Sequence, residues 1–195
     1  SCYISNGFNI GNLIISLLII AWALRLGSFL FLRICKEGED KRFKFIKPSA
    51  PRFFMTWTLQ GMWVSVCSLS ALTAMSSSTG VVVNRVFVIG IFIFISGLLL
   101  EVIADYQKTQ FRNQLENNGH FISSGLWAYS RHPNYVGEIV LWTGVSVMSF
   151  SSLSGVQYIA LISPIFTYLL LVYVSGVRIL ETSGKERWGH LKSYQ

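Results

Sequence analysis

The sequence is poor in charged residues and in residues that bind metals. Only 13% of its 195 residues are charged, whereas about a quarter is usual for a soluble domain. Its three cysteines, Cys2, Cys35 and Cys67, form no CxxC pair, so they predict neither a zinc site nor a disulfide framework. The three histidines are too few and too scattered for a membrane di-iron centre, and no HExxH motif occurs. We therefore expect no metal site.

The motifs of several enzyme classes are also missing. Neither GxGxxG nor GxxxxGK[ST] occurs, so a nucleotide would have to be bound without a Rossmann or P-loop fold. The GxSxG turn of many serine hydrolases is absent as well.

Long apolar stretches are what the sequence does contain. Hydrophobic residues make up 52% of the chain, and its mean hydropathy is +0.50. Stretches with at most one charge cover residues 10–32, 53–75, 81–100 and 139–177. The last of these is long enough for two membrane crossings, because one crossing needs about 20 residues. The sequence predicts an all-α integral membrane protein, a bundle of about five transmembrane helices that forms one domain over residues 1–195.

The boundaries of the crossings follow from the same pattern. The first three are expected at about Ile10–Leu32, Phe53–Met75 and Val82–Ile103, and the third should continue as a helix to Arg112. The fourth should begin near Tyr135 and the fifth near Val156, with a kink at Pro164.

The net charge of +7 is unevenly distributed. Seven Lys and Arg residues lie in residues 33–52 and others follow the third and fifth crossings, whereas the loops around residues 76–85 and 151–155 hold only Arg85. Short cytoplasmic loops collect Lys and Arg, so the basic end is expected in the cytoplasm. The basicity thus reflects membrane topology, and no nucleic-acid partner is expected.

The third crossing ends in a stripe of charged residues. Glu101, Asp105, Lys108 and Arg112 are spaced by four, three and four residues, which places them on one helical face. One interpretation is an interfacial helix held by surface contacts. The other is a cofactor wall, in which the carboxylates accept hydrogen bonds from ribose or amide groups and the Arg112 guanidinium holds phosphate.

The sequence SRHPNYVGEIVLW opens the fourth crossing with another cluster of polar residues. Tyr135, Glu138 and Trp142 share one helical face, and Glu138 should lie about one turn inside the membrane. A carboxylate at that depth needs a partner, and Arg131 and Asn134 are close in sequence. The alternative is a helix cap with an interfacial Tyr/Trp belt.

Arg25 lies about two turns inside the first crossing, on the same segment as Trp22 and Arg33. Its long side chain could reach the membrane interface. Alternatively, it has a buried phosphate or carboxylate partner.

Four segments of the chain resemble an uncharacterised membrane family related to the steroid 5-alpha-reductases. They are WALRLGSFLFLRICKEGEDKRF, EVIADYQKTQFR, GLWAYSRHPNYVGEIVLW and SGVRILE. The resemblance implies a membrane reductase of the endoplasmic reticulum or the bacterial inner membrane. It would bind NADPH from the cytoplasm and reduce a carbon–carbon double bond in a lipid or steroid-like substrate. It also implies family segments before and after this chain.

The resemblance also implies which residues form the site. The cofactor-binding residues would be Arg25, Arg33, Glu101, Asp105, Arg112, Arg131, His132 and Asn134, with Glu101 at a position where the family usually has asparagine. The catalytic centre would contain Glu138, Tyr135 and Trp22. Trp22 takes the place of the tyrosine with which steroid reductases polarise a carbonyl, and an indole N–H donates a hydrogen bond without being an ordinary acid.

Two other functions are compatible with parts of the sequence. Membrane methyltransferases that use S-adenosylmethionine share the Arg-His-Pro-x-Tyr motif and a downstream glutamate, which Glu181 could supply. A non-catalytic membrane subunit would need no polar stripe. The charged stripe and the basic segment after the first crossing favour the reductase, because a cofactor without phosphates has less need of so many cations.

Overall fold

The computed structural model describes residues 9–37 and 46–191, and every regular element within those ranges is helical. The long helices are α2 (Ile10–Glu37), α3 (Ala50–Cys67), α5 (Arg85–Asn113), α6 (Pro133–Phe150) and α8 (Val177–Trp188). Shorter elements are α4 (Leu69–Met75), α7 (Ser163–Leu169), the 3-10 helices η2 (Leu115–Asn117), η3 (Gly125–Ala128) and η4 (Gly155–Ile162), and the π-helix η5 (Leu170–Ser175).

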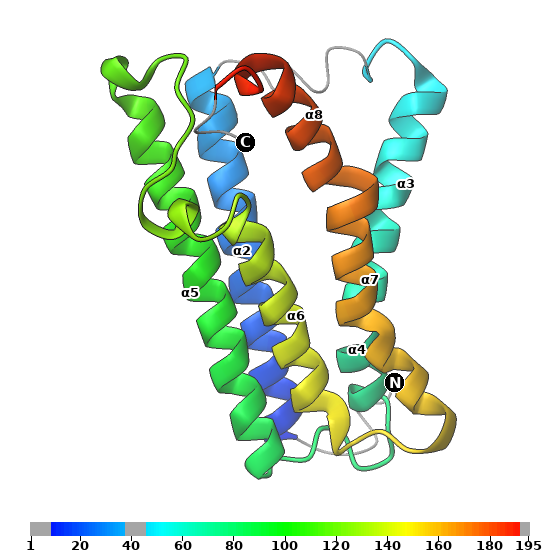
Figure 1. The fold of residues 1–195 in the computed structure, drawn as a ribbon. Helices are drawn as coiled ribbons and strands as arrows, with labels where there is room; N and C mark the ends of the chain where they lie inside the picture. The colour runs from blue at the N-terminus through cyan, green and yellow to red at the C-terminus, as the bar shows by residue number, and fades with distance from the viewer. Residues whose placement is uncertain (1–8, 38–45, 192–195) are drawn as a thin grey trace.

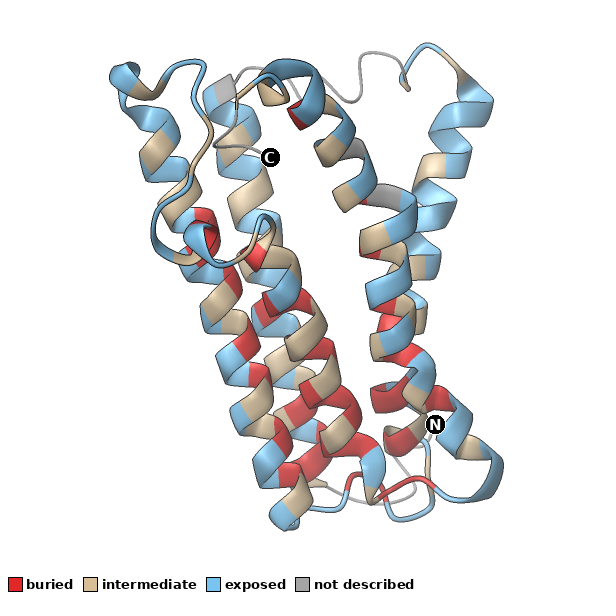
Figure 2. Ribbon diagram, viewed as in Figure 1, coloured by how far each residue is buried: buried red, intermediate tan, exposed pale blue. Residues whose placement is uncertain are grey.

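The helices form an elongated bundle, with α8 across one end (Figure 1). Helix α6 packs against α5 on one side and against α4 and α7 on the other. Buried residues concentrate where α5 and α6 face each other, while the outward faces are exposed (Figure 2).

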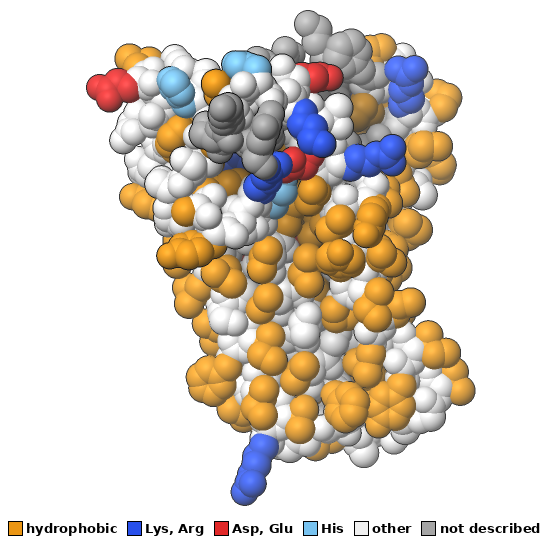
Figure 3. Space-filling model, in the orientation of Figure 1, with side chains coloured by type: hydrophobic (Ala, Val, Ile, Leu, Met, Phe, Trp, Pro, Cys, Tyr) orange, Lys and Arg blue, Asp and Glu red, His pale blue; other side chains and the backbone are white. Residues whose placement is uncertain are grey.

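The chain is a multi-pass membrane protein. Within the described residues, three helical segments are long and apolar enough to cross a bilayer by themselves: Ile10–Lys36, Arg85–Asn113 and Gly155–Val174. Apolar side chains cover the middle of the surface, and the basic side chains gather almost entirely at the end that carries α8 (Figure 3). The predicted helical membrane fold is therefore confirmed, while the predicted number of about five crossings is not established by these three segments.

Glycines bring α5 and α6 into backbone contact. Gly90 on α5 faces Gly144 on α6, and Gly97 faces Gly137. On each helix the two glycines are seven residues apart. A Cβ atom added at Gly97 would lie 2.4 Å from the backbone nitrogen of Leu141. Small residues permit such close approach between membrane helices, so these positions fix the separation of the two backbones.

Hydroxyl and thiol groups join α3 to α7. The Ser163 hydroxyl donates to the backbone oxygen of Cys67 at 2.6 Å, and the Cys67 Sγ lies 3.1 Å from the Thr167 hydroxyl. Pro164, the position of the predicted kink, lies where the 3-10 helix η4 passes into α7. It lies in the first turn of α7, where a missing backbone N–H breaks no helical hydrogen bond.

The polar turn before α5 is attached to the start of α2. The Asn12 side chain accepts a hydrogen bond from the Val81 N–H at 2.8 Å, and Asn9 donates to the Thr79 carbonyl at 3.1 Å. The prediction that the third crossing continues as a helix to Arg112 is confirmed, since α5 ends at Asn113. The charged segment KEGEDKRFKF lies largely in residues 38–45, outside the described residues.

Candidate functional site

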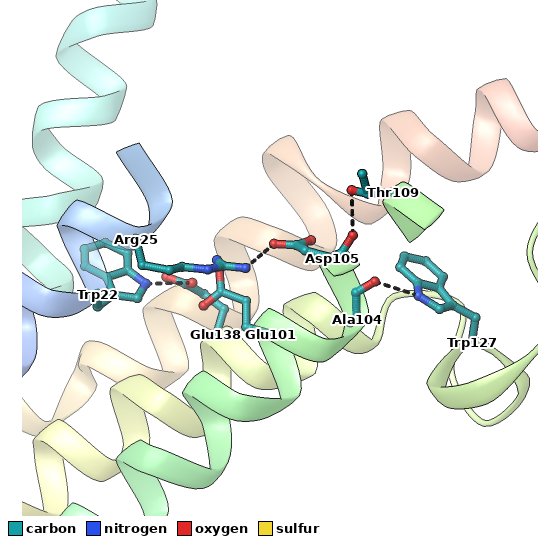
Figure 4. Close-up of polar contacts among 8 residues, drawn as sticks. All are labelled: Trp22, Arg25, Glu101, Ala104, Asp105, Thr109, Trp127 and Glu138. Carbon is teal, nitrogen blue, oxygen red and sulfur yellow. Dashed lines mark hydrogen bonds and ion pairs between the residues drawn. The ribbon is translucent and has the colours of Figure 1, made fainter. Parts of the chain in front are cut away.

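A buried charged cluster lies where α2 meets α5. The Arg25 guanidinium donates to Glu101 at 2.5 Å through one nitrogen and to Asp105 through another (Figure 4). The Glu101 side chain is 6% exposed and the Arg25 side chain 19%. Of the alternatives for Arg25, the structure therefore shows a carboxylate partner. One turn of α5 separates the two carboxylates, which lets a single planar guanidinium bind both.

Glu138 lies beside this cluster, inside a group of indole rings. The Trp22 Nε1 donates to Glu138 at 3.2 Å, and the Trp142 Nε1 donates to its other oxygen at 2.8 Å. Trp22 also contacts Trp142 edge to face, with ring centroids 5.0 Å apart, and Trp63 from α3 at 6.1 Å. The expected partner Arg131 is wrong, because Glu138 is held by indole N–H groups that apolar surroundings tolerate.

The glycine contact brings the Glu101 and Glu138 carboxylates close together. A Cβ atom added at Gly137 would lie 2.7 Å from the backbone nitrogen of Glu101, so no side chain separates α5 from α6 at this level. The charge of Glu138 acts on Glu101, and the two carboxylates lie next to each other in Figure 4. Among the described residues, the buried Glu101 Oε2 has no hydrogen-bond partner.

The stripe on α5 continues toward the basic end. Lys108 lies over the Trp127 ring, 4.4 Å from its centroid, and the Trp127 Nε1 donates to the Ala104 carbonyl at 3.0 Å. Arg112 is exposed in the last turn of α5, and the charges of Arg112 and Arg33 both act on Lys108. The polarity along α5 thus changes from buried carboxylates to exposed cations.

A second charged cluster joins the start of α6 to α8. The Arg131 guanidinium donates to Glu181 at 2.7 Å, and the His132 Nε2 lies 3.0 Å from the other Glu181 oxygen. Burial lowers the pKa of His132 although Glu181 partly opposes this effect. Burial alone would raise the pKa of Glu181, but the hydrogen bonds from His132 and Arg131 outweigh it and lower the pKa below its ordinary value.

The remaining expected residues lie around these two clusters. Tyr135 stacks on His132, with ring centroids 5.5 Å apart, and its ring lies against the backbone of Gly176. Asn134 is half-buried in the first turn of α6, and its side chain makes no hydrogen bond within the described part of the chain. Lys36 at the end of α2 donates to Asn113 at 2.5 Å.

A protein family described as "Protein of unknown function (DUF1295)" matches residues 1–195. The chain belongs to the DUF1295 family. This DUF1295 protein is also similar to the 3-oxo-5-alpha-steroid 4-dehydrogenase 2 of Homo sapiens, with 32% identity over 65 residues, which cover 33% of the chain and 26% of the human protein. It is 36% identical to the steroid 5-alpha-reductase DET2 of Arabidopsis thaliana over 67 residues, 33% of the chain and 25% of the plant protein.

The match to these curated reductases therefore spans about a quarter of their length. A probable O-methyltransferase, ustE of Ustilaginoidea virens, is 28% identical over 90 residues, which cover 45% of the DUF1295 chain and 32% of the fungal protein. No solved structure matches the chain significantly. The resemblance to the reductase-related family, which the sequence motifs indicated, is confirmed.

Two residues of the DUF1295 site escaped prediction. Trp63 on α3 contacts the Trp22 ring, with ring centroids 6.1 Å apart. Trp127 lies in the 3-10 helix η3 and contacts Lys108. Both are tryptophans, which composition alone assigns to a core or to a membrane interface. No spacing in the sequence marks them as neighbours of charged residues.

Proposed function

We propose that the protein is a membrane-embedded reductase that uses NADPH to reduce an activated carbon–carbon double bond in a lipid or steroid-like substrate. One observation carries this proposal: on α5 the buried carboxylates Glu101 and Asp105 are followed by Lys108 and the exposed Arg112, and basic side chains gather at the end of the molecule that carries α8 (Figure 3). The similarity of a third of the chain to steroid 5-alpha-reductases supports the class of reaction.

The donor and acceptor groups of this end suit a dinucleotide phosphate. The hydroxyl groups of ribose and the amide of nicotinamide are hydrogen-bond donors, for which Glu101, Asp105 and Glu138 provide acceptors. Phosphate groups need cations, and Arg guanidinium groups bind them in bidentate geometry. Arg112 and Arg131 are exposed at the same end, so the residues present fit the cofactor.

Each part of the site would then have its own task. Arg33, Arg112 and Arg131 would hold phosphates, with Arg25 fixing the carboxylates on α5. Glu138, held by Trp22 and Trp142, would orient the nicotinamide end near the substrate. His132, Asn134 and Tyr135 would line the entrance at the start of α6. When bound, NADPH supplies a hydride, and the apolar surroundings would keep water away from the reacting atoms.

The proposed topology has five crossings and a cytoplasmic cofactor site. Helices α3 and α6 each have 18 residues, which corresponds to a length of about 27 Å, close to the ~30 Å hydrocarbon thickness of a bilayer. Together with the three longer apolar segments they make five. The basic end then faces the cytoplasm, since short cytoplasmic loops are rich in Lys and Arg.

Ligand-induced stabilisation of the purified protein in detergent tests this proposal. NADPH is expected to raise the melting temperature more than S-adenosylmethionine does, because a ligand that binds only the folded state stabilises it. Arg112→Ala should weaken NADPH binding about tenfold or more, since a hydrogen bond to a charged group contributes about 1.5–3 kcal/mol. Arg85→Ala, which removes a cation at the opposite end, is the matched control. Stabilisation by S-adenosylmethionine alone would show that the reductase proposal is wrong.

A second candidate function, an S-adenosylmethionine-dependent methyltransferase, has one specific observation in its favour. Arg131 and His132, from the motif shared with membrane methyltransferases, both contact Glu181, and part of the chain is similar to a probable O-methyltransferase. Under this alternative, Glu181→Gln should abolish stabilisation by S-adenosylmethionine. Under the reductase proposal, it should leave most of the stabilisation by NADPH intact.

A further inference from the structure

The buried cluster contains more negative than positive charge. Arg25 faces three carboxylates, those of Glu101, Asp105 and Glu138. Counting Lys108, which acts on Asp105 from one turn away, gives two positive and three negative groups if all are ionised. Uncompensated charge is very costly in a membrane-embedded bundle. One further positive charge, of which a proton is the smallest, would balance these five groups.

The geometry indicates where this proton is held. The Arg25 guanidinium occupies the Glu101 Oε1 and one Asp105 oxygen, and two indole N–H groups occupy both oxygens of Glu138. In the part of the chain that the structure describes, no donor reaches the Glu101 Oε2, although the Glu101 residue is 95% buried. Glu138 lies beside it (Figure 4). A proton between these two carboxylates would satisfy the Oε2 atom and remove the repulsion.

We propose that Glu101 and Glu138 share one proton in the folded protein, and that this pair donates the proton consumed by the reductase reaction. Two carboxylates in one site do not both ionise readily, and such a pair is a recurrent proton store. The second half of the proposal rests on the proposed reductase function. It also gives the reaction an acid that the indole of Trp22 cannot provide.

The step balances with the groups named. Reduction of an enone C=C bond needs a hydride at the β-carbon, supplied by the bound nicotinamide, which is thereby oxidised. The π electrons of the C=C bond move toward the carbonyl, and the pair's proton then forms the new C–H bond at the α-carbon. The pair is left with both carboxylates ionised beside Arg25, and it regains a proton from water at the basic end.

Among the described residues, few other titratable groups face the pair. Arg25 approaches from α2, Asp105 and Lys108 follow on α5, and the buried Cys67 thiol faces Glu138 from α3. The thiol is neutral when protonated, so it does not alter the count of charges. The charges of Lys108, which lies over Trp127, and of Arg25 are already part of that count.

Infrared spectroscopy of the cofactor-free protein in detergent tests the shared proton directly. At pH 7 the wild type should show a carboxylic-acid C=O band that shifts in D2O and disappears only at alkaline pH. Glu101→Gln and Glu138→Gln should each remove it, because either change balances the charges. Glu181→Gln, a matched change in the exposed cluster, should leave it. The absence of the band at pH 7, or its persistence in both variants, overturns the proposal. The wild-type titration decides the matter even if a variant fails to fold.

NADPH oxidation with a 3-oxo-4-ene steroid in micelles tests the donor role. The wild-type kcat should fall over the same alkaline range in which the band is lost, and Glu101→Gln should lower kcat about 10²–10⁴-fold, the usual contribution of a general acid. A kcat that stays constant across that range contradicts the donor role. If NADPH does not bind, the reductase function fails, while the infrared result still decides whether the proton is shared.

Discussion

Two charged clusters lie toward the same end of this protein, and both combine an arginine with carboxylate partners. Around Arg25, whose side chain is 19% exposed, one guanidinium faces three carboxylates. Around Arg131, whose side chain is 49% exposed, one carboxylate faces a guanidinium and an imidazole. The buried cluster is unbalanced and is surrounded by indole rings, whereas the exposed one can exchange its contacts for water. The exposed cluster joins the start of α6 to α8, and we propose that the buried cluster takes part in the reaction.

The largest difference in stability between the two clusters is expected when the buried Arg25 guanidinium is removed. Arg25→Ala should destabilise the fold by about 3–5 kcal/mol, the cost of leaving a buried charge without its partner. Thermal unfolding in detergent would measure this, with Arg112→Ala as the control for loss of an exposed arginine. Equal melting temperatures for the two variants would mean that burial does not distinguish the clusters.

A smaller effect is expected from separating the helices that carry the buried carboxylates. Gly137→Ala places a Cβ atom 2.7 Å from the Glu101 nitrogen and from the Gly97 oxygen, and such overpacking costs about 1–3 kcal/mol. Gly27→Ala is the matched control, since nothing lies within 4 Å of the added atom and alanine is favoured in helices by up to ~1 kcal/mol. A loss of stability in the control as large as that in Gly137→Ala would contradict this reading of the contact.

The exposed cluster should contribute little to stability. Glu181→Gln removes the carboxylate partner of Arg131 and His132, and an ion pair with one exposed partner is worth about 0–1 kcal/mol. Its melting temperature should therefore remain close to that of the wild type. A loss comparable to that of Arg25→Ala would show that α8 depends on this contact for its position.

The smallest effect concerns pH. Because burial lowers the pKa of His132 in the folded protein, the unfolded chain binds its proton first as the pH falls below about 6.5, and stability decreases. The lowered pKa of Glu181 makes its contribution persist until more acidic pH. Melting temperatures at pH 7.5, 6.5 and 5.5 should fall less in His132→Asn than in the wild type. A constant difference between the two proteins would contradict the assignment.

The sequence predicted the helices and one side of each cluster. Apolar stretches located the membrane helices because lipid contact demands them, and the spacing of Glu101 and Asp105 placed both carboxylates on one face of α5. The partner of these carboxylates could not be inferred. Arg25 lies 76 residues from Glu101, and its position fitted either an interfacial or a buried side chain. Only the packing of α2 against α5 distinguishes the two.

The environment of Glu138 was equally hidden. Local sequence suggested Arg131 or Asn134 as its partner, but Arg131 lies before the start of α6 and contacts Glu181 on α8 instead. The Trp22 indole comes from a helix 116 residues away. Periodicity predicts the face of the helix on which a residue lies. Which residues of a neighbouring helix pack against that face depends on how the two helices cross.

The glycines of α5 and α6 have one further consequence. Where side chains set the spacing of two helices, a rotamer change can adjust it, but at Gly97 and Gly137 backbone touches backbone. The distance between the Glu101 and Glu138 carboxylates therefore depends on the absence of side chains at these two glycines. Even the smallest substitution, glycine to alanine, would push the helices apart and could not adjust this distance finely. Differences in how firmly the proposed pair retains its proton would then arise from the side chains around it, such as Trp22 and Arg25 of α2 and Trp142 of α6.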